Sequence, residues 1–413
     1  MENGFEIGDL KDYTILCPNM APNQFTLIQA ALMSEGYQIE LLSTASSNVA
    51  QLGLQYVHND TCYPALLIIG QFIEALQSGM YDLDHTALII TQSGGGCRAS
   101  NYIKLLRKAL DNAGFSQVPV VSVNVNGLEK GMSMKLTPKL IGKLVAAAEY
   151  GDLIDALYHE CAAYEVNPGE TRKKTVEWLD RIAEWLMTDR NWHIHDVKEN
   201  FSVIVNDFAL IPLKRCEKVK VGIVGEIYVK FSPLGNHDLV RFLEKEGCEV
   251  RLPGIMGYIE YCIANMKLDS DFYGMKPMLG KICDQVLSIV DGLGTSMSDA
   301  LKAAGFHYES SFREIMEKPE GILSLGVKMG EGWLLTAEMI ELIESGFTNI
   351  VCAQPFGCLP NHIAGKGVIR AIREKYPQAN ITPVDYDPSS TNVNQENRIR
   401  LMLAVGNEQL SGK

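Results

Sequence analysis

The sequence predicts an α/β protein with two Rossmann-like, doubly wound lobes, whose parallel sheets are related by duplication. The main observation is a unit that occurs twice, at residues 86–97 (TALIITQSGGGC) and 348–358 (TNIVCAQPFGC). Each is an apolar β-branched run, a glycine-containing break, and a cysteine that precedes an amphipathic helix and another strand. The helices before these units also end alike, in IEALQSG at 73–79 and IELIESG at 340–346. This agreement is typical of an internal repeat.

The first half alternates apolar runs with helical patterns. Strands are predicted at residues 13–17, 38–42 and 118–124, besides the run before Cys97, and helices at about 24–35 and 64–78. The longest helix has Pro64 near its start and Gly79 just past its end, which is the usual placement of these residues. Strands that alternate with helices predict a parallel sheet.

The second half repeats this order. Strands are predicted at residues 219–223, 249–252 and 380–385, besides the run before Cys358, and helices at 237–246 and 333–345. The same alternation predicts a second parallel sheet.

Two stretches interrupt the pattern and are predicted to be inserted helical layers. Residues 138–215 show helical periodicity and join the lobes, and residues 257–318 do the same inside the second lobe. We interpret both as structural cover. The expected organisation is a first lobe at 1–137, a helical connection at 138–215, and a second lobe at 216–413 with its insertion at about 257–318.

Composition indicates an intracellular, redox-active protein. The chain has 413 residues with 46% hydrophobic content, enough for a large core, and its ten cysteines lie at irregular spacings without a secretory leader. A disulfide framework is therefore not expected, and a reducing cytoplasm is the expected compartment. The net charge of -13, without a Lys/Arg block, argues against nucleic acid and anionic membranes as partners.

Three cysteines differ from the rest because each stands where a loop leads into a helix. Cys97 and Cys358 follow the glycine-containing breaks, and Cys62 follows a polar loop before Pro64. A helix N-terminus favours a thiolate, and ligands bind at such strand-to-helix turns in open α/β sheets. The repeat, aligned on the shared helix endings, pairs Cys62 with Met329.

The remaining cysteines lack such an approach. Packing is the expected role of Cys161, Cys216, Cys248, Cys262 and Cys283, since a free cysteine is among the most buried residue types. Cys17 ends the first strand at a site-facing position, and its role stays open.

Three thiolates in one cleft fit an iron-sulfur cluster better than zinc. Structural zinc sites prefer short Cys-x2-4-Cys pairs, whereas five residues separate Cys352 from Cys358, the nearest pair here. Three protein ligands leave one iron open for a substrate. Glycines Gly94, Gly95, Gly96 and Gly357 would let the backbone approach a cluster and donate to its sulfides. Three packed thiols remain the alternative.

Several long motifs resemble the 2-hydroxyacyl-CoA dehydratase-related superfamily. They are NDTCYPA at 59–65, GGGCRASNYI at 94–103, GEIYVK at 225–230, QPFGCLPNHI at 354–363, DYDPSS at 385–390 and VNQENR at 393–398. The resemblance runs from about Tyr13 to Met402. It is strongest to the branch usually found as the C-terminal part of large proteins described as CoA-substrate-specific enzyme activases.

This resemblance implies a [4Fe-4S] cluster whose ligands are Cys62, Cys97 and Cys358. It also implies an ATP-hydrolysing activator protein that carries its own iron-sulfur cluster and injects one low-potential electron, and a homo- or hetero-dimeric assembly. A sister group holds a double-cubane cluster with extra cysteines and reduces small molecules. Cys352 and Cys17 keep that alternative open.

The mechanism that the resemblance implies is cluster-mediated one-electron reduction of a small-molecule or acyl-CoA substrate. For a 2-hydroxyacyl-CoA, a ketyl radical forms and a base then removes a β-proton. Glu226, at the end of a strand, and His362, four residues beyond Cys358, are the candidate bases. The alternatives are a helix-capping role for Glu226 and a surface position for His362. Plausible polar neighbours of the cluster are Arg98, Asn101 and Asn361.

The chain departs from this pattern because the activator half is missing. The segment 291–295 (DGLGT) partly matches a phosphate loop, but a leucine occupies the required glycine position, so we interpret it as an ordinary turn. Two other functions remain open: an electron-transfer or scaffold subunit without catalysis, and a solute-binding module without metal.

Overall fold

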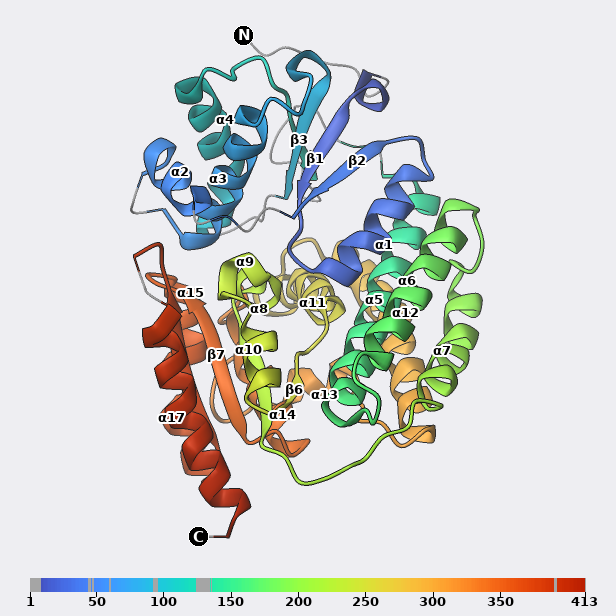
Figure 1. The fold of residues 1–413 in the computed structure, drawn as a ribbon, viewed down its shortest axis with the longest axis vertical. Helices are drawn as coiled ribbons and strands as arrows, with labels where there is room; N and C mark the ends of the chain where they lie inside the picture. Colours follow the sequence, from blue (N-terminus) through green and yellow to red (C-terminus); the bar gives the residue numbers. More distant parts are fainter. Residues whose placement is uncertain are drawn as a thin grey trace.

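The computed structural model of the chain describes residues 9–43, 46, 48–58, 61–91, 96–123, 134, 136–389 and 392–412. Two four-stranded parallel sheets flanked by helices confirm the predicted α/β class (Figure 1). Both lobes lie along one side of the molecule, and a layer of long helices covers the other side. No helix in the described part of the chain is long and apolar enough to cross a membrane.

The first lobe is built on a sheet with the order β2-β1-β3-β4. Its strands are β1 (Thr14–Pro18), β2 (Gln38–Leu42), β3 (Thr86–Thr91) and β4 (Val120–Val123). Its helices are α1 (Pro22–Met33), α2 (Asn48–Tyr56), α3 (Tyr63–Gln77) and α4 (Tyr102–Ala113), with short turns η1 (Asp9–Asp12), η2 (Leu83–His85) and η3 (Arg98–Asn101). The predicted strands and both predicted helices are present, whereas α2 was missed.

The second lobe repeats this topology as β6-β5-β7-β8. Its strands are β5 (Lys220–Gly225), β6 (Glu249–Arg251), β7 (Asn349–Pro355) and β8 (Asn380–Tyr386). Its helices are α8 (Ile227–Phe231), α9 (Pro233–Asn236), α10 (Leu239–Lys245), α14 (Gly332–Glu344), α15 (Leu359–Asn361), α16 (Ile369–Lys375) and α17 (Asn392–Leu410), with a π-helical turn η4 (His362–Lys366). Equal strand order in both sheets is the arrangement that duplication predicts.

The helical layer consists of the two predicted insertions. Its members are α5 (Pro138–Tyr164), α6 (Glu170–Met187), α7 (Ile194–Phe208), α11 (Ile255–Tyr273), α12 (Pro277–Ala303) and α13 (Phe312–Glu317). The sequence prediction of a turn at 291–295 is wrong, because this segment lies inside α12. Gly292 and Gly294 are tolerated there because the flanking turns of a 27-residue helix are already packed on α11 and α7.

One buried carboxylate joins the two insertions within the helical layer. Asp152 on α5 accepts hydrogen bonds from the backbone N–H groups of Ile255 (3.0 Å) and Met256 (2.9 Å), the first residues of α11. It therefore satisfies the free donors of that helix N-terminus. Gly254 allows the approach, since a Cβ there would lie 2.4 Å from Asp152 Oδ2.

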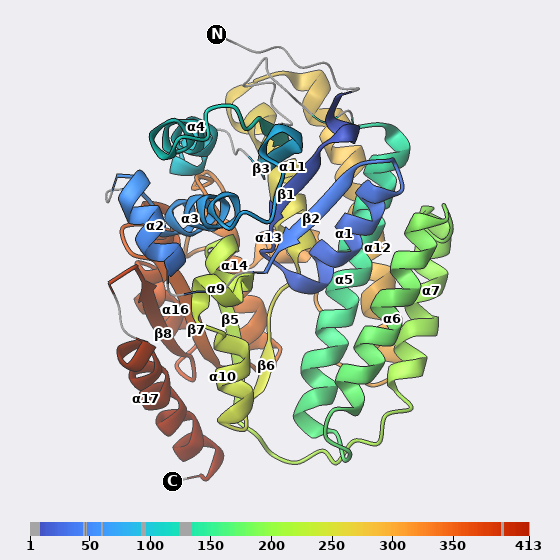
Figure 2. The ribbon, with the colours of Figure 1, turned by 45° about the horizontal axis from the view of Figure 1, so that its top comes forward.

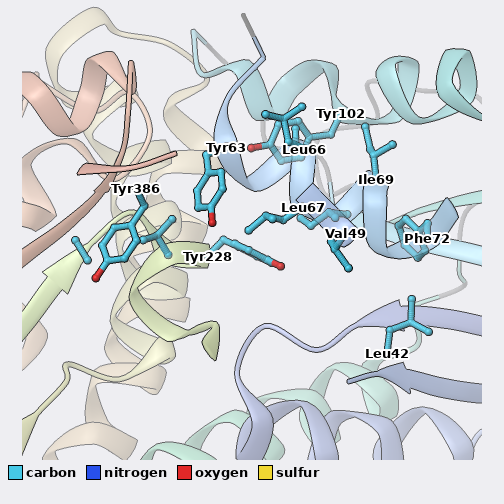
Figure 3. Close-up of a cluster of buried hydrophobic side chains, with 14 of the residues drawn as sticks. Leu42, Val49, Tyr63, Leu66, Leu67, Ile69, Phe72, Tyr102, Tyr228 and Tyr386 are labelled. Carbon is cyan, nitrogen blue, oxygen red and sulfur yellow. The ribbon is translucent and has the colours of Figure 1, made fainter. Parts of the chain in front are cut away.

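The two lobes meet through a hydrophobic core that they share. The start of α3 packs on the second lobe, where Tyr63 lies beside Tyr228 of α8 and Tyr386 of β8 (Figure 3). Tyr102 of α4 belongs to the same cluster. This contact holds the N-terminus of α3 against the carboxyl-terminal ends of the second sheet.

Candidate functional site

Each sheet has a topological switch point at its carboxyl-terminal edge. β1 and β3 are neighbours, yet the connections that follow them lead to β2 and β4 on opposite sides, and β5 and β7 are arranged in the same way. Such switch points are where open α/β sheets bind ligands. Four of the predicted site residues lie at the carboxyl-terminal ends of these central strands. Cys17 is near the end of β1, while Cys97, Glu226 and Cys358 follow β3, β5 and β7.

The three singled-out cysteines are all N-cap residues of helical segments. Cys62 caps α3, Cys97 caps the turn η3 before α4, and Cys358 caps α15, each with an extended backbone. The Cys62 and Cys358 sulfurs interact with the backbone N–H groups of Ala65 and Asn361, three residues further on. All three residues are partly buried. The three cysteines therefore lie at helix entrances, where part of each residue remains accessible.

The thiols belong to one electrostatic neighbourhood. Cys62 interacts with Cys97 and with Glu226, and Glu226 in turn interacts with Cys358. Residues from both lobes therefore lie within electrostatic range of one another.

In the described part of the chain, no three His, Cys, Asp or Glu side chains gather closely enough to hold a single metal ion. In a tetrahedral zinc site the sulfurs lie about 4 Å apart, because each bonds the same ion at about 2.3 Å. Cysteines of a cubane each bond a different iron, so they are spread more widely. The shared cluster stays a prediction.

Two side chains hydrogen-bond with the cysteine sulfurs. The Tyr102 hydroxyl lies 2.7 Å from Cys62 Sγ, and Asn361 Nδ2 donates to Cys358 Sγ at 3.3 Å. Asn361 Nδ2 also donates to Glu331 at 3.0 Å, while its buried Oδ1 has no hydrogen-bond partner. Asn361 was a predicted polar neighbour of the site, whereas Tyr102 and Glu331 were missed.

Burial dominates the acidity of these thiols. It raises the pKa of Cys62 to about 11, although the hydrogen bond with Tyr102 acts in the opposite direction. Burial also raises the pKa of Cys358 strongly, and the neighbouring Glu331 adds to the rise. We expected helix N-termini to favour thiolates. For Cys62 and Cys358 that expectation is wrong in the protein without metal, because the desolvation of the thiolate outweighs the effect of the helix dipole. A bound metal would have to displace the protons.

Two buried carboxyl groups face each other beside the thiols. Glu226 caps α8 by accepting from the Val229 N–H at 2.9 Å, and Glu331, the N-cap of α14, accepts from the Ile227 N–H at 3.1 Å. Burial, and then the proximity of Glu331, raise the pKa of Glu226 to about 8. Glu226 can therefore hold or release a proton near neutral pH. Glu226 therefore caps α8 and can also exchange a proton.

Glu331 occupies the structural position that corresponds to Cys62. Both are the N-cap of the helix that precedes the third strand of their sheet. Met329, the partner that the sequence alignment gave, lies two residues earlier and accepts from the Gly96 N–H at 3.1 Å through its sulfur. The lobes thus touch directly next to Cys97. The alignment of the repeat depends on the similar C-terminal ends of α3 and α14, so it could not show that the two helices begin at different points.

The other predicted residues are more dispersed. Gly94 and Gly95 lie outside the described residues; Gly357 has φ +73, which a side chain would strain. Arg98 and Asn101 are exposed around η3, and Asn101 makes no capping bond. His362 is half-buried in η4 with Nδ1 3.5 Å from Gln354 Nε2.

Both possible extra ligands lie in apolar surroundings. Cys352 is fully buried in β7 within the core that Val224, Met339 and Ile350 help to form. Cys17 packs on the core that includes Ile15 and Ile89. Burial raises the pKa of each to about 12.

One cysteine that was expected to pack is instead close to the site. Cys262 is exposed on α11, hydrogen-bonds with Tyr258 and interacts with Glu331, while Tyr258 also interacts with Cys97. The i, i+4 spacing of Tyr258 and Cys262 was visible in the sequence, but nothing indicated which face of α11 meets the site. Cys161, Cys248 and Cys283 are buried, as expected, whereas Cys216 is exposed.

A groove of about 630 Å³ lies at the opposite edge of the second sheet, around Lys220 and Asn349 at the amino-terminal ends of β5 and β7. Its cations are already engaged: Arg215 with Glu160 at 2.7 Å and Lys218 with a backbone carbonyl at 3.1 Å. This groove is lined by none of Cys62, Cys97 and Cys358.

A scan of the sequence against models of protein families finds no match, and a search among curated proteins finds none either. Similarity therefore assigns no family, and the function rests on the chemistry of the site.

Proposed function

We propose that Cys62, Cys97 and Cys358 hold a [4Fe-4S] cluster between the lobes, and that the protein uses it for one-electron reduction of a small-molecule or acyl-CoA substrate. The observation that carries this proposal is that three helix N-cap cysteines, two from the first lobe and one from the second, lie in one electrostatic neighbourhood around Glu226. It agrees with the resemblance to 2-hydroxyacyl-CoA dehydratases. An ATP-hydrolysing activator with its own cluster would then supply the electron.

The donor set fits such a cluster. Thiolates are the usual ligands of iron-sulfur clusters, and three of them leave one iron free. Tyr102 and Asn361 already hydrogen-bond with two of the three sulfurs, as outer partners of metal ligands commonly do. When bound, a cluster of this kind supplies a low-potential electron and a Lewis-acidic iron.

The proton chemistry falls to Glu226 and Glu331. Glu226, with a pKa of about 8, can act as acid or base near neutral pH. Asn361 joins Glu331 to Cys358 through hydrogen bonds of 3.0 Å and 3.3 Å, so it orients the carboxyl group relative to the thiol. His362, which lies beside Gln354, is the weaker candidate base.

A single cubane is favoured over the double cubane of small-molecule reductases. Cys352 and Cys17, the ligands that a larger cluster would need, both pack within apolar cores. An electron-relay or scaffold subunit remains the second candidate, and a saturated cluster without substrate-accessible iron would favour it.

The test is anaerobic purification with iron and sulfide analysis, and EPR of the dithionite-reduced protein. About four irons per chain are expected, the content of one cubane. Cys97→Ser and Cys358→Ser should lose the iron and keep the fold. The matched control Cys283→Ser should keep the iron and lose about 1–3 kcal/mol of stability, since its buried hydroxyl lacks a partner.

Equal iron content in the three variants would contradict the ligand assignment. Iron well above four per chain, falling in Cys352→Ala, would instead support the double cubane. A colourless, iron-free protein from strictly anaerobic cells would favour the solute-binding alternative.

A further inference from the structure

One face of α12 is apolar along nearly its whole length. The residues on this face are four, four and three positions apart, and this pattern repeats every eleven residues. They are Met278, Ile282, Val286, Ile289, Leu293, Met297 and Ala300. Eleven residues make three turns of a straight α-helix, so these side chains share one face.

Only the second half of this face is covered. Leu293 and Ala300 are buried and Met297 is partly buried, in the core that α7 shares through Phe201 and Val205. α12 runs beside α7 in the helical layer (Figure 2). In the first half of the same face, Met278 is 78% exposed and Ile282 and Ile289 are each 51% exposed. In the described part of the chain, no helix packs on this first half of the face as α7 packs on the second half.

The open half extends onto the hairpin between α11 and α12. Large apolar residues exposed around it are Phe272, Tyr273, Met275 and Leu279, which join Met278, Ile282, Val286 and Ile289. We call these eight residues the hairpin patch. With about half of each side chain exposed, and about 150–250 Å² for a large one, the patch offers on the order of 800 Å². That exceeds the usual largest patch of a monomer and equals one side of a standard interface.

We propose that the hairpin patch is a dimer interface that binds the same patch on a second copy of this chain. The stripe is self-complementary. In an antiparallel pair with its two-fold axis between Ile282 and Val286, Met278 lies opposite Ile289, and Ile282 lies opposite Val286. Each α12 then covers the other as α7 covers its second half. A two-fold axis requires such a self-complementary surface.

The charges around the patch permit this pairing. Two copies of a chain with net charge -13 repel each other, so an interface without unpaired acids is favoured. None of the eight patch residues is charged, and the exposed Lys276 and Lys281 flank them. The nearby acids are paired within the chain: Asp284 with Arg313 at 3.1 Å and Asp271 with Lys267 at 2.6 Å. The inference does not depend on a cluster at the cysteines.

The test is sedimentation velocity of the full chain across about 1–50 µM, the range in which standard-size interfaces associate. The wild type should be a dimer. Ile282→Glu and Met278→Glu each place a charge in the patch and should weaken dimerisation at least 100-fold. The matched control Leu210→Glu alters a residue that is 76% exposed outside the patch, and should leave the dimer intact. Circular dichroism verifies folding of each variant.

A cross-link tests the geometry independently. Gln285 is exposed beside the stripe near the proposed axis, so Gln285→Cys should form a covalent dimer on mild oxidation. Leu210→Cys, and the wild type with its exposed Cys216 and Cys262, should not. A wild type that stays monomeric at 50 µM overturns the proposal, including when the patch binds a different protein. Equal dimerisation of Ile282→Glu, Met278→Glu and the control Leu210→Glu overturns the proposal as well.

Discussion

Replacing Lys230 by methionine should destabilise the protein by about 3–5 kcal/mol near pH 7.5, the typical cost of breaking a buried ion pair. Lys230 of α8 donates to Glu338 of α14 at 3.0 Å, and their side chains are only 4% and 5% exposed. Methionine preserves much of the length but leaves the carboxylate buried without its cation. The pair joins the two helices whose N-caps are Glu226 and Glu331, so it also supports the candidate site.

The loss should depend on pH in a defined direction. Burial raises the pKa of Glu338 above its usual 4.5, and Lys230 opposes that rise. Without Lys230 the pKa rises further, so above about pH 4.5 the folded variant keeps a proton that the unfolded chain releases. In that window each pH unit costs the folded variant about 1.4 kcal/mol. The deficit relative to wild type should therefore shrink by up to about 2.7 kcal/mol between pH 7.5 and pH 5.5.

Urea unfolding followed by tryptophan fluorescence at both pH values measures this deficit, since Trp333 on α14 is fully buried. The double variant Lys230→Met/Glu338→Leu is the control, and should recover at least half of the loss because the lone carboxylate is gone. The remainder reflects Glu309 and Glu331, whose charges Lys230 also stabilises. A deficit below about 1 kcal/mol, or one that does not change with pH, would refute the reasoning.

Two further predictions concern the end of β5 and the acid that follows it. Gly225→Ala should cost about 3 kcal/mol or more in thermal unfolding, because a Cβ would lie 1.9 Å from the Ala353 carbonyl oxygen at a φ of +156. Gly294→Ala in α12 meets open space and should instead stabilise the helix by about 0.5–1 kcal/mol; losses in both variants would contradict the steric argument. In the iron-free protein, the raised pKa of Glu226 means that its contribution is complete below about pH 4.5 and is lost as pH rises through about 8. Glu226→Gln should flatten the wild-type decline over that range, and an unchanged pH profile would show that Glu226 does not carry it.

Much of the fold could be predicted because its signals are local. The apolar run before Cys97 and the run before Cys358 became β3 and β7, and the cap of α3 fell on Cys62. The short helices α8 and α9 were missed, since Ser232 and Pro233 interrupt any helical period within a few residues. The error at 291–295 has the opposite cause: glycines favour a turn locally, but tertiary packing along α12 overrides that preference.

The candidate site was only partly readable for the same reason. Cys62, Cys97 and Cys358 each follow a recognisable turn, so the sequence could single them out. Glu331, Tyr102 and Cys262 have no such local mark. Their proximity to the site arises from contacts between different elements, such as Cys62 with Tyr102, 40 residues apart, and Glu331 with Asn361, 30 residues apart. The acidity of the site is likewise a tertiary property, since burial reverses the effect that helix N-termini have on an exposed thiol.

The sequence by itself determined the α/β class, the duplicated order of strands and helices, and the three helix-capping cysteines. These depend on periodicity, glycines and prolines, which act over a few residues. The tertiary structure alone decided the pairing of Glu226 with Glu331, the contact of Met329 with Gly96, and which half of the α12 face is covered. These depend on how the lobes and the helical layer pack, and burial, the orientation of side chains and the exposed apolar surface exist only once they have packed.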